Sequence, residues 1–200
     1  MLETKKYILT VEGETEQWYF LWLRDQINKV ETRTYNASIV VKVQQSPRSF
    51  YKGTNSKITP EAIHICDLES TDKFHLEKFQ NILEEMKEAK KQKNIKYHLG
   101  YSNFTFELWI ILHKKDCFGP LTDRKQYLVP IQQCFNEKFE DLDHFKREDI
   151  FKRCLRKLTL QNIRDNKKIT NHSGYKYYRD NPALSINEIV ERILSECGVL

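Results

Sequence analysis

The chain has 200 residues, of which 40% are hydrophobic and 30% charged, and its formal net charge is +5. This composition excludes a disordered chain and allows a real hydrophobic core, while the small basic excess permits a nucleic-acid partner without requiring one. The five cysteines are an odd number and include no Cys-x-x-Cys pair, which argues against a disulfide framework and a zinc site. No apolar stretch is long enough for a signal-peptide core or a membrane span. We therefore predict a cytoplasmic protein with no membrane partner.

A strand that ends in a carboxylate is predicted near the N-terminus. Residues 7–11 are mostly apolar, Gly13 permits a sharp turn, and apolar residues from position 18 onward recur at helical spacing. Glu12 therefore lies where a strand passes into a helix. Ligands of open α/β sheets bind at this edge, so Glu12 is a candidate metal ligand or general base. Glu16 is an additional candidate, although an acid in the first helical turn is also explained by the helix dipole.

A second strand is predicted over residues 38–43, and residues 44–59 are predicted to form a long loop because they contain Pro47 and Gly53 and have no periodicity. Arg48 and Lys52 lie in this loop. They are candidate nucleic-acid-binding residues that would contact phosphates, and the alternative is an ordinary solvated loop.

The next predicted strand, residues 62–67, repeats the first arrangement. It is almost continuously apolar and ends at Asp67, with Glu69 and Asp72 close behind. Two apolar strands that each end in an acid are typical of parallel βαβ units, which would bring Glu12, Asp67 and Glu69 to one edge of the sheet. Converging carboxylates repel one another unless a cation neutralises them, and all-oxygen ligands favour Mg²⁺ or Mn²⁺.

A helix is predicted around residues 76–86, with Lys78 among the charged residues of its outer face, and a strand over residues 96–100. The very apolar segment 102–113 is predicted to be a buried helix capped by Ser102 and Asn103. Glu107 lies inside this segment and needs a partner, either a structural ion pair or the site itself. His113 is a candidate phosphate contact, with packing as the alternative.

The rest of the chain is predicted to be largely helical. Helices are expected at about 127–139 and 148–160, and a capping box at residues 185–188 opens the last helix. Between them, Lys176 and Arg179 stand among tyrosines, as in loops that stack bases and bind phosphate, although such loops also pack for structural reasons. We predict a catalytic core over residues 1–115 and a helical C-terminal extension over 116–200 that packs on it.

Two motifs together resemble the Toprim fold of topoisomerases, primases and OLD-type nucleases: Val11-Glu12-Gly13-x-x-Glu16 and Ile65-Cys66-Asp67-x-Glu69. The resemblance implies a mostly parallel, Toprim-like central sheet flanked by helices, with Mg²⁺ held between the two motifs. Asp67-Leu68-Glu69 departs from the Asp-x-Asp pattern of that fold, which gives the third ligand a longer arm, and Asp72 is an alternative ligand.

More narrowly, the chain resembles the RloB family of bacterial Toprim proteins found with phage-defence loci. Its supporting segments, in chain order, are Glu12-Gly13-Glu14-Thr15-Glu16, Phe106-Glu107-Leu108-Trp109 with Leu112-His113, and Asn181-Pro182. Phe104 stands where the family pattern tends to have proline.

The resemblance implies a metal-dependent nuclease that cleaves RNA, such as tRNA, or DNA as an effector of antiviral defence and abortive infection. It also implies a partner ATPase of the ABC or OLD kind, and a homodimer is compatible with it. The alternatives are a non-catalytic nucleic-acid-binding or regulatory subunit and a nucleotidyl transferase.

Overall fold

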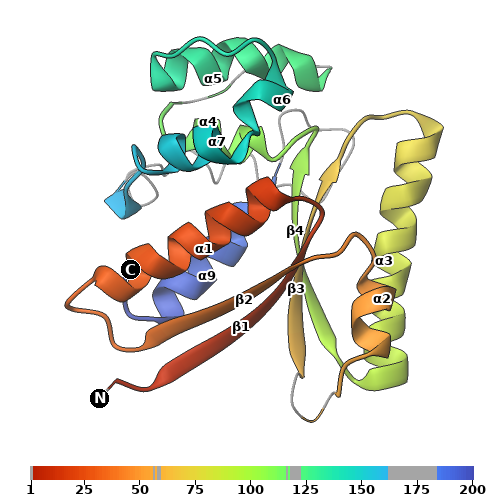
Figure 1. Cartoon of the computed structure of the whole chain (residues 1–200). Coiled ribbons are helices and arrows are strands. Elements are labelled where there is room, and N and C mark those ends of the chain that lie inside the picture. Colours follow the sequence, from red (N-terminus) through yellow and green to blue (C-terminus); the bar gives the residue numbers. More distant parts are fainter. Residues whose placement is uncertain (1, 56, 58–59, 116, 118–122, 162–183) are drawn as a thin grey trace.

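Four parallel strands form the central sheet of the computed structural model, which describes residues 2–55, 57, 60–115, 117, 123–161 and 184–200. The strand order is β2-β1-β3-β4 (Figure 1). The bounds are β1 Thr4–Val11, β2 Asn36–Val43, β3 Glu61–Leu68 and β4 Lys96–Asn103. The predicted α/β fold with a parallel central sheet flanked by helices is confirmed, and it is consistent with a Toprim-like arrangement.

Helices cover both faces of this sheet. The helices α1 (Glu14–Lys29) and α9 (Ile186–Glu196) lie on one face, and α2 (Pro47–Lys52) and α3 (Lys73–Lys93) lie on the other (Figure 1). Strand β3 is buried on both sides because its alternate side chains enter different hydrophobic clusters. This double burial explains why its sequence is nearly continuously apolar.

Short helices form a lobe beside the carboxyl edge of the sheet (Figure 1). They are α4 (Glu107–Leu112), the 3₁₀ helix η1 (Arg124–Tyr127), α5 (Leu128–Phe135), α6 (Leu142–Phe145) and α7 (Glu148–Leu155). The predicted helices at 127–139 and 148–160 are therefore present but shorter. Helix α5 ends where Asn136 adopts a left-handed conformation with φ of 49°.

The predicted helix over residues 102–113 is wrong in its first part. Strand β4 continues to Asn103, which is paired in register with Leu68 of β3, and the helix begins only at Glu107. Ser102 does not cap a helix, because its hydroxyl donates to the Asp67 carboxylate. The peptide bond between Asn103 and Phe104 is cis. Tertiary pairing with β3 thus overrides the local capping signal.

Two other local predictions are corrected. The segment 44–59 contains helix α2, which begins because Ser46 accepts a hydrogen bond from the Ser49 amide and Pro47 suits the first helical turn. The capping box at residues 185–188 does not form. The Ser185 hydroxyl instead donates to the Leu99 carbonyl and accepts from the Tyr101 amide, so it ties the start of α9 to β4.

The C-terminal part of the chain packs on the N-terminal part. Helix α9 contacts β4, and α7 contacts α1. One hydrophobic cluster includes side chains from β1, α1, α7 and α9. In the part of the chain that the structure describes, no helix combines the length and apolarity needed to cross a membrane.

Candidate active site

A cavity of about 300 Å³ opens at the carboxyl edge of the sheet, below the helical lobe. We call it the acid cavity, after the carboxylates Glu12, Asp67 and Glu69 that line it. Further lining residues are Glu14, Glu16, Lys78, Arg124 and Lys146. The three acids predicted to converge therefore face one space, together with three cationic side chains.

Glu12 lies at the end of β1 and is held by β3. Its Oε2 atom accepts a hydrogen bond of 2.9 Å from the amide of Asp67. Its Oε1 atom is buried and has no hydrogen-bond partner among the described residues, while the ammonium of Lys78 lies 3.3 Å away. Burial raises the pKa of the Glu12 carboxyl, against the opposing effects of the Asp67 amide and Lys78. A buried carboxylate oxygen without a hydrogen bond is a site at which a cation can bind.

Asp67 is oriented by two hydrogen-bond donors, one in β4 and one just before α4. The Ser102 hydroxyl donates to Oδ1 at 2.5 Å, and the Phe106 amide donates to Oδ2 at 3.1 Å. Burial, followed by the neighbouring carboxylates of Glu16 and Glu12, raises the pKa of Asp67 well above its usual value. Asp67 is therefore fixed in position among groups that disfavour its negative charge.

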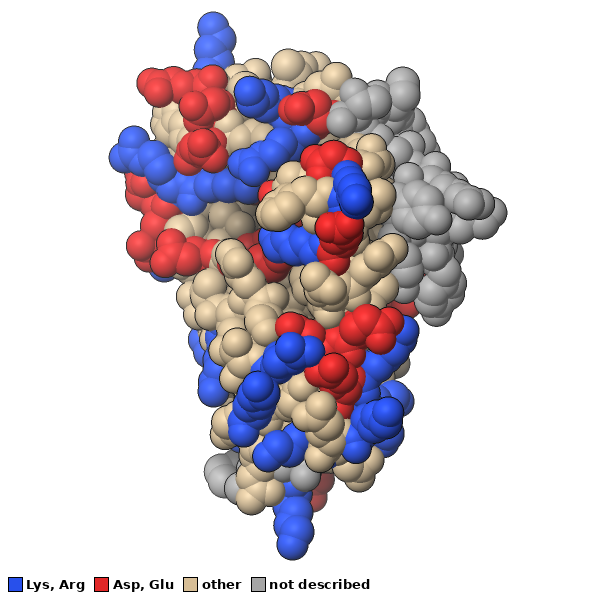
Figure 2. Space-filling model, turned by 90° about the vertical axis from the view of Figure 1, so that its right-hand side faces the viewer, with Lys and Arg blue, Asp and Glu red and all other residues tan. Residues whose placement is uncertain are grey.

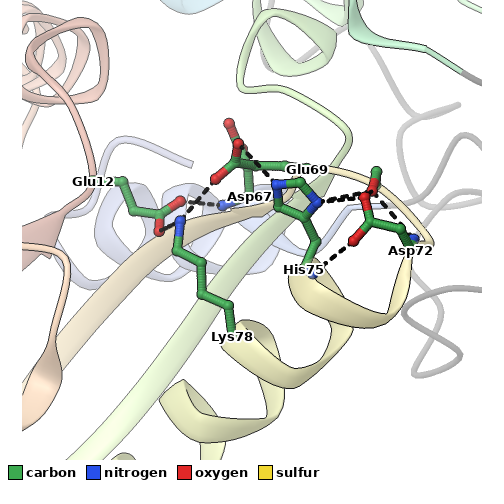
Figure 3. A network of polar contacts seen from close by, with 7 residues as sticks. Glu12, Asp67, Glu69, Asp72, His75 and Lys78 are labelled. Atoms are coloured by element: carbon green, nitrogen blue, oxygen red, sulfur yellow. Dashed lines mark hydrogen bonds and ion pairs between the residues drawn. The ribbon is translucent and has the colours of Figure 1, made fainter.

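Glu69 and Glu12 share one lysine. The Lys78 ammonium lies 2.7 Å from Oε1 of Glu69 as well as 3.3 Å from Glu12, and Figure 3 shows it reaching from α3 to both carboxylates. Burial opposes the charge of Lys78, but the two carboxylates outweigh it and raise its pKa. Lys78 also outweighs the effect of burial on Glu69 and lowers the pKa of that carboxyl. The prediction that Lys78 belongs to a solvated outer face is wrong.

The oxygen ligands of the acid cavity suit a hard divalent cation, but Lys78 is already paired with two of them. Glu12, Asp67 and Glu69 offer only oxygen ligands, and Oε1 of Glu12 has an ion pair with Lys78 but no hydrogen-bond partner among the described residues. In the described ranges, however, no three His, Cys, Asp or Glu side chains are arranged to hold a metal ion. The ammonium of Lys78 lies 3.3 Å from Glu12 and 2.7 Å from Glu69, so the donor chemistry suits Mg²⁺ or Mn²⁺ while the arrangement in the structure is that of an ion-paired cluster.

Comparison with known proteins identifies the family. The profile of the family described as RloB-like protein matches residues 7–193. The chain belongs to the RloB-like protein family. No curated protein and no solved structure matches it.

Asp72 does not join the acid cavity of this RloB-like protein. It caps α3 by accepting a hydrogen bond of 2.9 Å from the His75 amide, and its carboxylate also contacts the side chains of Ser70 and His75. Figure 3 places it on the far side of His75 from Glu12. Capping, and not metal binding, explains an acid at this position.

Glu107 and Glu16 form a buried polar group with Lys146. Glu107 is fully buried, accepts a hydrogen bond from the Thr105 hydroxyl and lies 3.4 Å from the Lys146 ammonium. Burial, and then the charge of Glu107, raises the pKa of Glu16 to about 7. Burial opposes the charge of Lys146, but Glu107, Asp67 and Glu16 together raise its pKa. Glu107 thus has the predicted ion pair, while Glu16 and Lys146 also line the cavity.

His113 lies in the aromatic core and outside the acid cavity. Its Nε2 atom is 3.1 Å from the Tyr19 hydroxyl, and its ring packs against Trp109 with centroids 4.8 Å apart. Burial lowers the pKa of His113 to about 3. The structure therefore supports the alternative interpretation, in which His113 is a packing residue.

The two predicted nucleic-acid-binding residues that the structure describes, Arg48 and Lys52, do not line the acid cavity. Arg48 is paired with Glu88 of α3 at 2.7 Å, and Lys52 is exposed at the end of α2. Lys176 and Arg179 lie outside the described residues. On the face that carries α2 and α3, Lys and Arg side chains are interspersed with Asp and Glu (Figure 2). The described residues of this face therefore form no single broad basic patch.

Three cationic residues of the cavity, Lys78, Arg124 and Lys146, were not predicted. A signal existed for Lys78, because side chains in the first turns of a helix point toward its N-terminus and so toward the ends of the neighbouring strands. Arg124 and Lys146 come from the helical lobe and reach the cavity only through tertiary packing. No local pattern identifies them.

Proposed function

We propose that this RloB-like protein is a metal-dependent Toprim-type nuclease that acts as an effector in antiviral defence. The observation that carries the proposal is the convergence of Glu12, Asp67 and Glu69 in a cavity rimmed by cationic side chains. Phosphodiester cleavage needs positive charge opposite the scissile phosphate and a proton acceptor for the attacking water. The acid cavity contains candidates for both.

Glu12, Asp67 and Glu69 would hold Mg²⁺ or Mn²⁺. The ion would supply positive charge that neutralises the scissile phosphate as charge develops on it. Glu12 would in addition accept or return a proton, because burial raises its pKa above that of an ordinary glutamate. The hydrogen bonds that Asp67 accepts from Ser102 and Phe106 would keep its carboxylate in a fixed position for this role.

The three cations would bind and position the nucleic-acid backbone. Arg124 and Lys146 enter the cavity from the helical lobe, opposite the strand ends that carry the acids. A phosphate between the two layers would contact positive charge on one side and the metal site on the other. This arrangement would orient the backbone without selecting a base sequence.

A non-catalytic nucleic-acid-binding or regulatory subunit is the second candidate, and one observation favours it. Lys78 forms ion pairs with both Glu12 and Glu69 within the chain itself, so these two carboxylates already share a cationic partner without a metal ion. In that case the carboxylates of the cavity would no longer bind a metal ion and would have only a structural role. A nucleotidyl transferase remains as a third outcome to be tested.

The deciding experiment incubates the purified chain with tRNA, bulk RNA, and single- and double-stranded DNA, with Mg²⁺, Mn²⁺ or EDTA. We expect cleavage of at least one substrate with metal and none with EDTA. Glu12→Gln and Asp67→Asn should each lower the rate by about 100-fold or more, because each removes a carboxylate that would hold the metal ion and Glu12→Gln also removes the proton acceptor. Glu84→Gln, on the exposed face of α3, is the matched control and should retain the wild-type rate.

Cleavage that survives both Glu12→Gln and Asp67→Asn would overturn the assignment. Nucleic-acid binding without cleavage in any metal would favour the non-catalytic subunit. A product that forms only with nucleoside triphosphates would favour the transferase. The ATPase partner and the defence role implied by the family would be tested separately, by coexpression of the two proteins during phage infection.

A further inference from the structure

The acid cavity contains its own counter-ion. Two carboxylates that directly follow different strands, Glu12 after β1 and Glu69 after β3, meet at the ammonium of Lys78, at 3.3 Å and 2.7 Å. The Glu12 side chain is only 12% exposed, so its negative charge is poorly screened by water. Without a cation at this point, the two carboxylates would repel each other across a partly desolvated space.

Lys78 lies where a single cation can bind two carboxylates at once. Its ammonium lies between two predicted metal ligands, and the atom it faces on Glu12 is Oε1, which has no hydrogen bond among the described residues. The other ligand, Asp67, is held by Ser102 and the Phe106 amide and does not depend on the lysine. Lys78 is therefore the ionic partner of the one Glu12 oxygen that accepts no hydrogen bond from the described residues.

We infer that Lys78 is an internal counter-ion that competes with a divalent cation for Glu12 and Glu69. This inference rests on the metal site of the proposed function and adds a regulatory step to it. The metal-free chain is stabilised by the ammonium, and metal binding requires the ammonium to leave. A lysine suits this exchange, because it is a point charge on a flexible stem and its side chain is 34% exposed.

The exchange has a consequence for substrate binding. An ammonium released from Glu12 and Glu69 remains tethered to α3 at the rim of the cavity, next to the place where a phosphate would bind. Metal and nucleic-acid backbone would then bind with positive coupling, because the phosphate offers a new partner to the displaced lysine. The free protein is accordingly expected to bind metal weakly.

The test is Mn²⁺ binding to the full chain by isothermal titration calorimetry, without nucleic acid, for wild type, Lys78→Met and Lys73→Met. We expect Lys78→Met to bind Mn²⁺ about tenfold more tightly or better, since a competing cation has been removed. Lys73 is the matched control, because it is on the same helix, 91% exposed and 3.8 Å from Glu77. Lys73→Met should bind Mn²⁺ as the wild type does.

Thermal unfolding gives a second readout that needs no activity. In EDTA, Lys78→Met should unfold at a lower temperature than wild type, and saturating Mn²⁺ should raise its melting temperature by more than that of wild type. Lys78→Arg keeps the positive charge and should retain the weak metal binding of wild type. It also serves as the folded reference if Lys78→Met does not fold in EDTA.

Equal or weaker Mn²⁺ binding by Lys78→Met would overturn the competition. If Lys78→Met does not fold, tight Mn²⁺ binding by Lys78→Arg would overturn it as well. These results are separable from the proposed function: a chain that cleaves nucleic acid while Lys78→Met gains no metal affinity is a nuclease without the counter-ion exchange. A chain that gains metal affinity but cleaves nothing keeps the exchange and loses the nuclease.

Discussion

His113 shows how one buried side chain can set the pH dependence of stability. Its pKa in the folded chain is about 3, because its ring is buried against Tyr19 and Trp109. An exposed histidine has a pKa of about 6.5, so the unfolded chain binds a proton first as the pH falls. The folded state must therefore lose stability between about pH 6.5 and pH 3.

We expect His113→Gln to flatten this pH dependence by up to about 1.4 kcal/mol per pH unit between pH 6 and pH 4, which is the slope for one proton. Urea unfolding at a series of pH values measures it. His64, whose pKa burial lowers to about 4, remains in the variant and contributes a slope of the same sign. An unchanged slope would mean that His113 is protonated in the folded chain.

At the scale of elements, the close approach of α9 to β4 depends on Gly100. A Cβ atom there would lie 2.6 Å from Cδ1 of Ile65 and 3.2 Å from Cγ1 of Ile189 in α9. Both neighbours are buried, so they have little room to move. We expect Gly100→Ala to destabilise the protein by about 1–3 kcal/mol, the usual effect of overpacking, as measured by chemical denaturation.

Gly53 provides the matched control for that substitution. A Cβ atom at Gly53 would have only the Phe50 carbonyl oxygen nearby, at 3.9 Å, and its φ of −87° is accessible to alanine. Gly53→Ala should therefore change stability by less than about 0.5 kcal/mol. Equal effects of the two substitutions would show that α9 does not press closely on β4 in solution.

At the scale of the whole molecule, the helical lobe and the sheet are joined through α1. Phe151 of α7 is fully buried, and its ring lies 5.9 Å from that of Trp18 in α1 and 5.4 Å from that of Phe145 in α6. Because these side chains belong to one hydrophobic cluster, loss of the Phe151 ring should weaken the lobe and the sheet together. We expect Phe151→Ala to destabilise the chain by about 3–5 kcal/mol.

The measurement is unfolding followed by both tryptophan fluorescence and far-UV circular dichroism. The two transitions should coincide in wild type and shift together in Phe151→Ala, as expected for one cooperative unit. Phe74→Ala is the control, since Phe74 is 71% exposed and should cost less than about 0.5 kcal/mol. Separate transitions would indicate that residues 1–115 and 116–200 unfold as two domains.

The strands and the main helices were predictable because their signals are local. Strand β3 is apolar because both its faces are buried, and the spacing of Phe20, Leu23 and Ile27 matches the buried face of α1. Two of the errors share one cause. Ser102 and Ser185 have side chains typical of helix caps, but both bind groups on neighbouring strands, Asp67 and the β4 backbone. The groups to which these two side chains hydrogen-bond lie far away in the sequence.

The sequence by itself determined the parallel α/β fold and the approach of Glu12, Asp67 and Glu69, because a strand that ends in an acid carries that acid to the edge of the sheet. Only the tertiary structure decided which charges surround these acids. Lys78, Arg124 and Lys146 come from three separate elements, and the pKa shifts they cause or undergo depend on burial and on distances of a few ångströms. Such distances are fixed by packing, so no local sequence pattern contains them.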